Sequence, residues 1–205
     1  MYNFITIGYD CSPAAALRNL DKRPFALPFD WVQSNISCIE ECIKDNFKKY
    51  HTNLHLNYIK SRLIDAYGFQ FPHDYPLVDM SGVEDHIGEG IFEEKPGSKV
   101  IVDNWQSYYE TVKEKYNRRI ERFINIVNDP APIIVLCRYS TDQALSIKDI
   151  FHKYYNKDNV YIVNSCSSPY ETKLMINVYT EKNGIWNECA LWKQAIDKII
   201  SVNEL

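Results

Sequence analysis

Cys11 is the residue whose setting in the sequence best suits covalent chemistry. It follows Phe4–Ile7, an apolar run of β-favouring residues, and the turn residue Gly8. Ser12 and Pro13 then suit the first positions of a helix. Free N–H groups and the positive dipole end at such a helix start favour a thiolate and a developing oxyanion. We therefore expect a lowered pKa and attack on an acyl carbon; the alternative is a small buried residue that packs the helix on the sheet.

His73 is the preferred partner base for this thiol. A cysteine nucleophile needs a base within hydrogen-bonding reach, and the base needs an orienting group. His73 opens the Gly-, Pro- and Asp-rich stretch Pro72 to Gly97 and has Asp74 beside it. Loops of that length in a compact domain are often functional, so we expect this one to overlie Cys11 and bring His73 to it. His86, in the same stretch, is the second choice.

Asp30 is the candidate for a third catalytic member. It stands between Phe29 and Trp31, and a carboxylate among aromatic residues requires partners. It could orient a histidine, cap a helix that starts near Val32, or pair with Arg18. The structural roles are the simpler explanation, and the sequence leaves the choice open.

The same residues resemble a known family. The segment GYDCSPAAALRNL and the block Leu27-Pro28-Phe29-Asp30-Trp31 are similar to the signature of a family described as putative papain-like cysteine peptidases, found in bacteria and large DNA viruses. Further matches over residues 4–140 are Phe71-Pro72-His73-Asp74, the Arg118/Arg119…Arg122-Phe123 segment and the strand ending in Arg138. The resemblance implies a cysteine-dependent hydrolase of peptide or other acyl substrates. Its catalytic candidates are Cys11, His73, Asp30 and Asp74, and its substrate-binding candidates are Arg18, Trp31 and Arg138.

Arg138 carries an alternative from another functional class. It ends the apolar run Ile133–Cys137, and an arginine there could hold an anionic or sugar-nucleotide ligand of a transferase or binding domain. The turn around Cys11 also resembles the Gly-Asp-Ser turn of lipase-like acyl hydrolases. A cysteine phosphatase loop fits less well, because the spacing from Cys11 to Arg18 is one residue too long and Pro13 lacks an N–H.

A zinc site is considered and set aside. The series Cys38, Cys42, His51 and His55 has the spacing C-x3-C-x8-H-x3-H, but its central gap is shorter than the usual ~12 residues. Helical periodicity already explains both cysteines as small core residues. We therefore expect no metal site and no cofactor.

Composition indicates a soluble globular protein. The chain has 205 residues, of which 45% are hydrophobic, and a net charge of -4. That charge argues against a general nucleic-acid or anionic-membrane surface. No apolar run approaches the ~20 residues that cross a bilayer. Six cysteines without a secretory signal indicate reduced thiols and a cytoplasmic location, or the host cytoplasm for a viral protein.

Hydrophobic periodicity predicts the elements that position these residues. Helices are expected over Val32–Tyr50, Leu54–Tyr67, Gln106–Asn128, Ser140–Tyr155 and Trp192–Val202. Strands are expected over Phe4–Ile7, Phe69–Phe71, Lys99–Val102, Ile133–Cys137 and Val160–Val163, with a hairpin from Leu174–Thr180 and Ile185–Leu191. The predicted fold is a single α/β domain, with a mostly parallel sheet covered by helices and a C-terminal β-hairpin. The carboxyl ends of the parallel strands should form one edge of the sheet, here called the rim. The residues expected there are Cys11, Arg138, Ser165 and Cys166.

Overall fold

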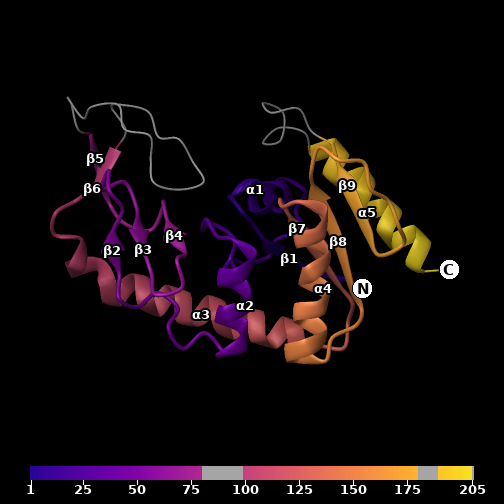
Figure 1. Ribbon diagram of the computed structural model, residues 1–205, viewed down its shortest axis with the longest axis horizontal. Coiled ribbons are helices and arrows are strands. Elements are labelled where there is room, and N and C mark those ends of the chain that lie inside the picture. The colour runs from indigo at the N-terminus through magenta and orange to yellow at the C-terminus, as the bar shows by residue number, and fades with distance from the viewer. Residues whose placement is uncertain (80–98, 180–188, 205) are drawn as a thin grey trace.

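The protein has an α/β fold with a four-stranded parallel sheet, as predicted. The computed structural model describes residues 1–79, 99–179 and 189–204. The sheet has the order β1-β7-β8-β9, with every neighbouring pair parallel. Its strands are β1 (Asn3–Ile7), β7 (Ile133–Cys137), β8 (Val160–Ser165) and β9 (Met175–Val178). Figure 1 shows this sheet on one side of the molecule, with both chain termini near it.

Helices cover both faces of the sheet. On one face lie α1 (Ser12–Asn19) and α5 (Cys189–Asn203), and on the other lie α2 (Ile36–Lys44), α3 (Tyr109–Asn128) and α4 (Thr141–Tyr155). Successive side chains of a strand point to opposite faces, so β7 contributes side chains to the hydrophobic core on each face of the sheet. Val135 packs with the second group of helices, whereas Ile134 and Leu136 pack with the first. This explains why the β7 sequence is apolar throughout. Within the described residues, no helix is long and apolar enough to cross a membrane.

The helix after β7 has the end signals that its sequence predicts. Ser140 accepts a hydrogen bond from the Gln143 backbone N–H, and the Gln143 side chain reaches back to the Ser140 backbone, which forms a capping box. Asn156 ends the helix in the left-handed conformation with φ 52°. These local signals fix both ends of α4, and α4 in turn returns the chain to β8 beside β7.

Two small antiparallel sheets extend the molecule away from the main sheet. One consists of β2 (His55–Leu56), β3 (Leu63–Ile64) and β4 (Gln70–Phe71), and the other of β5 (Leu77–Asp79) and β6 (Lys99–Ile101). A 3-10 turn, η1 (Trp105–Tyr108), leads from them into α3. In Figure 1, α3 runs beneath both small sheets and continues toward the main sheet.

The predicted helix over Leu54–Tyr67 is wrong, because this segment forms β2, β3 and the turns around them. Its apolar spacing suits a helix, but Lys60 within it adopts a left-handed φ of 55°, and His51 and Asn53 just before it have φ of 55° and 52°. Single residues of that kind interrupt a right-handed helix. The helix predicted over Val32–Tyr50 is present only as α2, which is shorter for the same reason.

The predicted C-terminal hairpin is described only in part. Its first arm becomes β9, which pairs in parallel with β8 at the sheet edge. Residues 180–188, with the proposed tip and most of the second arm, lie outside the described residues. The described end of that arm, Cys189–Leu191, forms the first turn of α5.

An aromatic cluster joins the Pro-Phe-Asp-Trp block to α3. Phe29 is 1% exposed, and its ring lies within 5.3–6.2 Å of the rings of Phe47, Tyr50, Phe69 and Phe123. Edge-to-face and stacked ring pairs of this kind favour one arrangement over others of equal buried area. The cluster therefore fixes the chain immediately before Asp30 and Trp31.

His51 lies buried in the same aromatic region. Its ring stacks on Tyr75, Tyr109 and Tyr116, and Nε2 lies 3.1 Å from the Tyr75 hydroxyl. Burial lowers the pKa of His51 to about 4. The imidazole is therefore neutral in the folded protein at pH 7, whereas in the unfolded chain it titrates near its usual value of ~6.5.

This difference predicts a loss of stability in acid. As the pH falls from 7 to 4, His51 becomes protonated in the unfolded chain but stays largely neutral in the folded protein. The free energy of unfolding should therefore drop by about 3 kcal/mol. Urea unfolding of wild type and His51→Asn across this range measures it, since asparagine tolerates the left-handed φ. In His51→Asn, the free energy of unfolding should depend less steeply on pH than in wild type. The control His55→Asn, at an exposed residue, should keep the wild-type slope. Equal slopes in all three proteins would contradict the assignment.

Candidate active site

Cys11 lies at the end of β1 and immediately before α1, as its sequence predicts. It is 6% exposed and has helical backbone angles. The turn depends on Gly8, because a Cβ there would lie 2.4 Å from the Asp10 carbonyl oxygen. The Gly8 carbonyl accepts a hydrogen bond from the Ser34 hydroxyl, which ties the turn to the core. The thiol is thus held on a turn that a larger residue at position 8 would displace.

Asp10 occupies the start of α1, which corrects one expectation. Its carboxylate accepts hydrogen bonds from the Ser12 N–H at 2.9 Å and the Ser12 hydroxyl at 2.6 Å. Pro13 has no N–H, and the Ala15 N–H binds the Cys11 carbonyl. The helix start is therefore largely filled by an anion and is not the open set of donors expected for an oxyanion. The Asp10 carboxylate thus already compensates the positive end of the α1 dipole.

His73 is brought to the Cys11 thiol. Its Nε2 lies 3.5 Å from Sγ, within the range of a hydrogen bond that involves sulfur. The Trp31 ring meets the His73 ring edge to face at 6.3 Å. The guanidinium groups of Arg18 and Arg23 each lie 5.3 Å from the centre of the Trp31 ring. The two family-like blocks and the Phe-Pro-His-Asp segment thus meet at one point in space.

Burial keeps both members of this pair neutral, so the expected lowering of the thiol pKa is wrong. Burial, with a further contribution from Asp10, raises the pKa of Cys11 to about 12. Burial also lowers the pKa of His73, against the raising effect of Asp74. Arg62 acts in the other direction on the thiol, since its positive charge lowers the pKa of Cys11. The resting pair is therefore a thiol and a neutral imidazole at pH 7.

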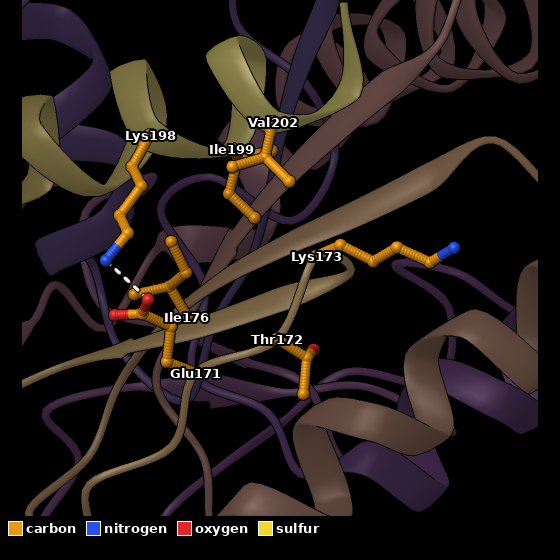
Figure 2. A pocket seen from close by; sticks show the side chains of 7 residues that line it. All are labelled: Glu171, Thr172, Lys173, Ile176, Lys198, Ile199 and Val202. Atoms are coloured by element: carbon orange, nitrogen blue, oxygen red, sulfur yellow. Dashed lines mark ion pairs between the residues drawn. The ribbon is translucent and has the colours of Figure 1, made fainter. Parts of the chain in front are cut away.

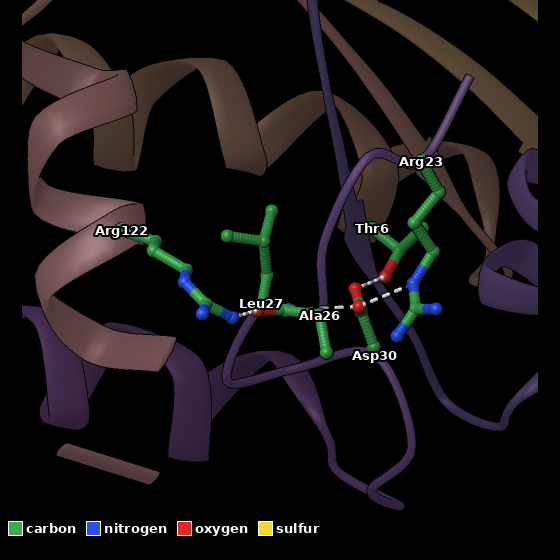
Figure 3. Close-up of polar contacts among 6 residues, drawn as sticks. All are labelled: Thr6, Arg23, Ala26, Leu27, Asp30 and Arg122. Carbon is green, nitrogen blue, oxygen red and sulfur yellow. Dashed lines mark hydrogen bonds and ion pairs between the residues drawn. The ribbon is translucent and has the colours of Figure 1, made fainter. Parts of the chain in front are cut away.

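Asp30 is fully engaged away from His73. Its carboxylate accepts hydrogen bonds from the Thr6 hydroxyl at 2.6 Å, the Arg23 Nε at 2.7 Å and the Leu27 N–H at 2.8 Å. Figure 3 shows these contacts, together with the bond from Arg122 to the neighbouring Ala26 carbonyl. Asp30 is 1% exposed. It ties the Pro-Phe-Asp-Trp block to β1 rather than orienting the histidine, and it pairs with Arg23 rather than Arg18.

Asp74 turns toward α3 instead of toward the His73 ring. The Tyr116 hydroxyl donates to it at 2.6 Å, and Lys115 forms an ion pair with it. These bonds fix the backbone next to His73 and so position the imidazole indirectly, without contact with the ring. Among the described residues, none accepts a hydrogen bond from His73 Nδ1. Residues 80–98, with His86 and most of the predicted covering loop, lie outside the described part of the chain.

Three of the four residues predicted to meet at the strand ends, Arg138, Ser165 and Cys166, line one pocket without Cys11, and the arginine is already paired. A pocket of about 270 Å³ is lined by residues that include Tyr9, Arg138, Ser165 and Cys166. The Arg138 guanidinium forms an ion pair with Asp10. Arg138 therefore connects the end of β7 to the Cys11 turn, and its charge is shared with a buried carboxylate. This weakens the alternative in which Arg138 binds an anionic ligand.

A larger pocket also has His73 in its lining, without Cys11. It has a volume of about 460 Å³, and its lining includes His73, Asp74, Tyr108, Lys115 and Arg118. Sequence periodicity placed the basic residues on one helix, but it gave no sign that His73 would face them. Arg62 was also missed, because its effect on both members of the pair depends on the fold of β2 and β3.

A third hollow lies between β9 and α5, and its lining includes neither Cys11 nor His73. It encloses about 190 Å³, and Figure 2 shows Ile176, Ile199 and Val202 in its lining. The ion pair between Glu171 and Lys198 crosses the same region. The two charges neutralise each other.

The residues of the considered zinc series are dispersed. Cys38 and Cys42 are buried in α2, whereas His51 lies in the aromatic cluster and His55 is exposed in β2. Over the described ranges, no group of three or more His, Cys, Asp or Glu side chains could hold a metal ion. Cys137 is buried in the sheet, and Cys166 is partly exposed.

Comparison with known proteins agrees with the motifs at this site. A family model described as "Putative papain-like cysteine peptidase" matches residues 2–164, which include the Cys11 turn, the Pro-Phe-Asp-Trp block and His73. No curated protein and no solved structure matches the chain. The match covers most of the main sheet and ends at β8, before β9 and α5.

Proposed function

The chain belongs to the family described as putative papain-like cysteine peptidases, and on that basis we propose that it is a cysteine-dependent hydrolase of peptide bonds or related acyl compounds. Cys11 is the nucleophile and His73 is the general base. The observation that carries the proposal is the 3.5 Å contact between Sγ and Nε2 of residues 62 positions apart in the chain. A thiol in contact with an imidazole is the pair that acyl transfer to sulfur requires.

The first half-reaction forms a thioester. The Cys11 sulfur attacks the acyl carbon while its proton passes to Nε2 of His73, which requires the histidine proton to be on Nδ1. A carbon–sulfur bond forms, and the carbonyl π electrons move onto oxygen. When this oxyanion collapses, the carbon–nitrogen bond breaks and the amine leaves with the proton held by His73.

The second half-reaction restores the enzyme. Water attacks the thioester carbon while His73 accepts one of its protons, and collapse of the new oxyanion breaks the carbon–sulfur bond. His73 returns the proton to the Cys11 sulfur. The net change is the addition of one water across the acyl bond, with no oxidant, metal or cofactor involved.

The electrostatics favour proton transfer during attack over a preformed thiolate. With the pKa of Cys11 raised to about 12, about one thiol in 10⁵ is ionised at pH 7 without assistance. The lowered pKa of His73 keeps the imidazole in its basic form. The positive charge of Arg62 then stabilises the negative charge that develops on the Cys11 sulfur as its proton leaves. A reactive thiol must stay reduced, which fits the proposed cytoplasmic location.

A substrate panel with two variants tests the proposal. Fluorogenic peptides and activated esters are supplied to wild type, Cys11→Ala and Arg138→Ala, and sugar nucleotides are screened by thermal shift. We expect acyl hydrolysis that falls at least about a hundredfold in Cys11→Ala, while the control Cys166→Ala keeps it. Hydrolysis unchanged in Cys11→Ala would contradict the proposal. Stabilisation by a sugar nucleotide that is lost only in Arg138→Ala would support the ligand-binding alternative.

A further inference from the structure

The pocket beside His73 has the location of a substrate subsite. It lies between the segment that follows β4 and the first turns of α3, and it shares His73 with the Cys11 pair. Its volume of about 460 Å³ lies within the usual range for small-ligand sites. A group that occupies it would therefore sit next to the base of the proposed reaction.

The charge of this pocket favours an anion. Lys115 and Arg118 are three residues apart on α3, so they lie on the same face of the helix. Lys115 is paired with Asp74, which leaves one net positive charge among these three residues. Arg118 is exposed and has no hydrogen bond or ion pair to a described residue.

The remaining lining suits the stem of a short acidic side chain. Tyr75, Val112 and Tyr108 contribute ring and aliphatic surface, and Tyr108 is 39% exposed. Apolar walls with a few polar groups are the usual composition of a site that orients a ligand. A planar guanidinium at the end of such a wall can hold a carboxylate with two parallel hydrogen bonds.

We infer that this pocket binds a carboxylate-bearing group of the substrate, such as an acidic side chain near the bond to be cleaved, with Arg118 as its specificity-determining residue. The inference rests on the proposed function, because it assumes that the bond is cleaved at Cys11. Lys115 remains with Asp74 and positions the backbone of His73, so the substrate carboxylate is held by Arg118.

A matched pair of reagents tests this inference. Bromoacetyl-glutamic acid amide and bromoacetyl-glutamine amide differ only in one charge, and site-resolved mass spectrometry gives the alkylation rate of Cys11 with each. Wild type should react about fivefold faster with the glutamic acid reagent, which is the effect of one exposed ion pair of ~1 kcal/mol. Arg118→Gln should remove this preference and Arg118→Lys should keep part of it. The control Arg122→Gln removes the same charge one turn along α3, outside the pocket lining, and should leave the preference intact.

A binding measurement separates this inference from the proposed function. Backbone amide shifts of the full chain are followed by NMR during titration with acetyl-glutamic acid amide or acetyl-glutamine amide. We expect shifts at Thr111, Lys115 and Arg118 with the acidic compound, and their loss in Arg118→Gln. If Cys11 fails to react but these shifts occur, the proposed function fails and the subsite stands. A Cys11 that reacts with both reagents at the same rate, or the absence of shifts selective for the acidic compound, would overturn the subsite.

Discussion

Replacing His73 with alanine is expected to lower kcat/KM for acyl hydrolysis by about a hundredfold to ten-thousandfold, the usual contribution of a positioned general base. The reason is the raised pKa of the Cys11 thiol, which leaves almost no thiolate at neutral pH unless a base accepts its proton. Nε2 of His73, 3.5 Å from Sγ, is the group in position to do so. Initial rates of wild type and His73→Ala with the best substrate of the panel measure the effect.

The control for this experiment is His55→Ala. His55 is exposed in β2, so its removal should change the rate by no more than about twofold. kcat and KM are measured separately, because His73 also lines the pocket around Arg118 and its loss could weaken binding. A wild-type kcat in His73→Ala would mean that another group is the base.

Replacing Asp30 with alanine is expected to reduce the free energy of unfolding by about 3–5 kcal/mol, the cost of breaking a buried ion pair by removing one partner. Asp30 is 1% exposed and holds Arg23, Thr6 and the Leu27 N–H at once. Without the carboxylate, a partly buried guanidinium, a hydroxyl and an N–H lose their acceptor together. Urea unfolding of wild type and Asp30→Ala at pH 7 measures the difference.

The control for Asp30 is Asp197→Ala. Asp197 pairs with Lys193 on the exposed face of α5, where such a pair contributes at most about 1 kcal/mol. Asp30→Asn adds a second comparison, because it keeps the volume but loses the charge. If Asp30 oriented the catalytic histidine instead, Asp30→Ala would lose activity at nearly unchanged stability, and that outcome would contradict the structural role.

The main sheet could be predicted because its signals are local. The run Ile133–Cys137 is apolar at every position, as a strand covered on both faces must be. The helix after it has a capping box at Ser140, and the strand that follows is again apolar. These features also place Cys11 and Arg138 at the carboxyl ends of adjacent strands, so the rim follows from the sequence alone.

The partners of the acidic residues could not be predicted, because they depend on segments far apart in the chain. Asp74 meets Tyr116 across 42 positions, and Arg138 meets Asp10 across 128. Sequence proximity suggested that Asp74 would act on His73, but its carboxylate binds Tyr116 and Lys115 of α3 instead. The filling of the α1 start by Asp10 is a local contact with Ser12, and it depends on a turn geometry that residue types alone did not indicate.

The misassigned segment Leu54–Tyr67 explains why Arg62 was overlooked. Its apolar residues have helical spacing, yet the left-handed residue Lys60 lies within it and Gly68 follows it, and the segment forms short strands and turns. In that arrangement the Asn57 side chain accepts a hydrogen bond from the Arg62 N–H. The charge of Arg62 then acts on both Cys11 and His73, an effect that no helical periodicity could reveal.

The most direct test of the account is the pH dependence of Cys11 alkylation by iodoacetamide in wild type and His73→Ala, followed at each cysteine by mass spectrometry. In wild type, the rate should rise with an inflection below pH ~6.5, where His73 becomes neutral, and stay level through neutral pH. In His73→Ala, this phase should disappear and the rate should rise only in alkaline solution. If both proteins show the same curve centred at the ordinary thiol pKa of ~8.5, or if Cys11 reacts no faster than Cys166, the Cys11–His73 pair is not catalytic.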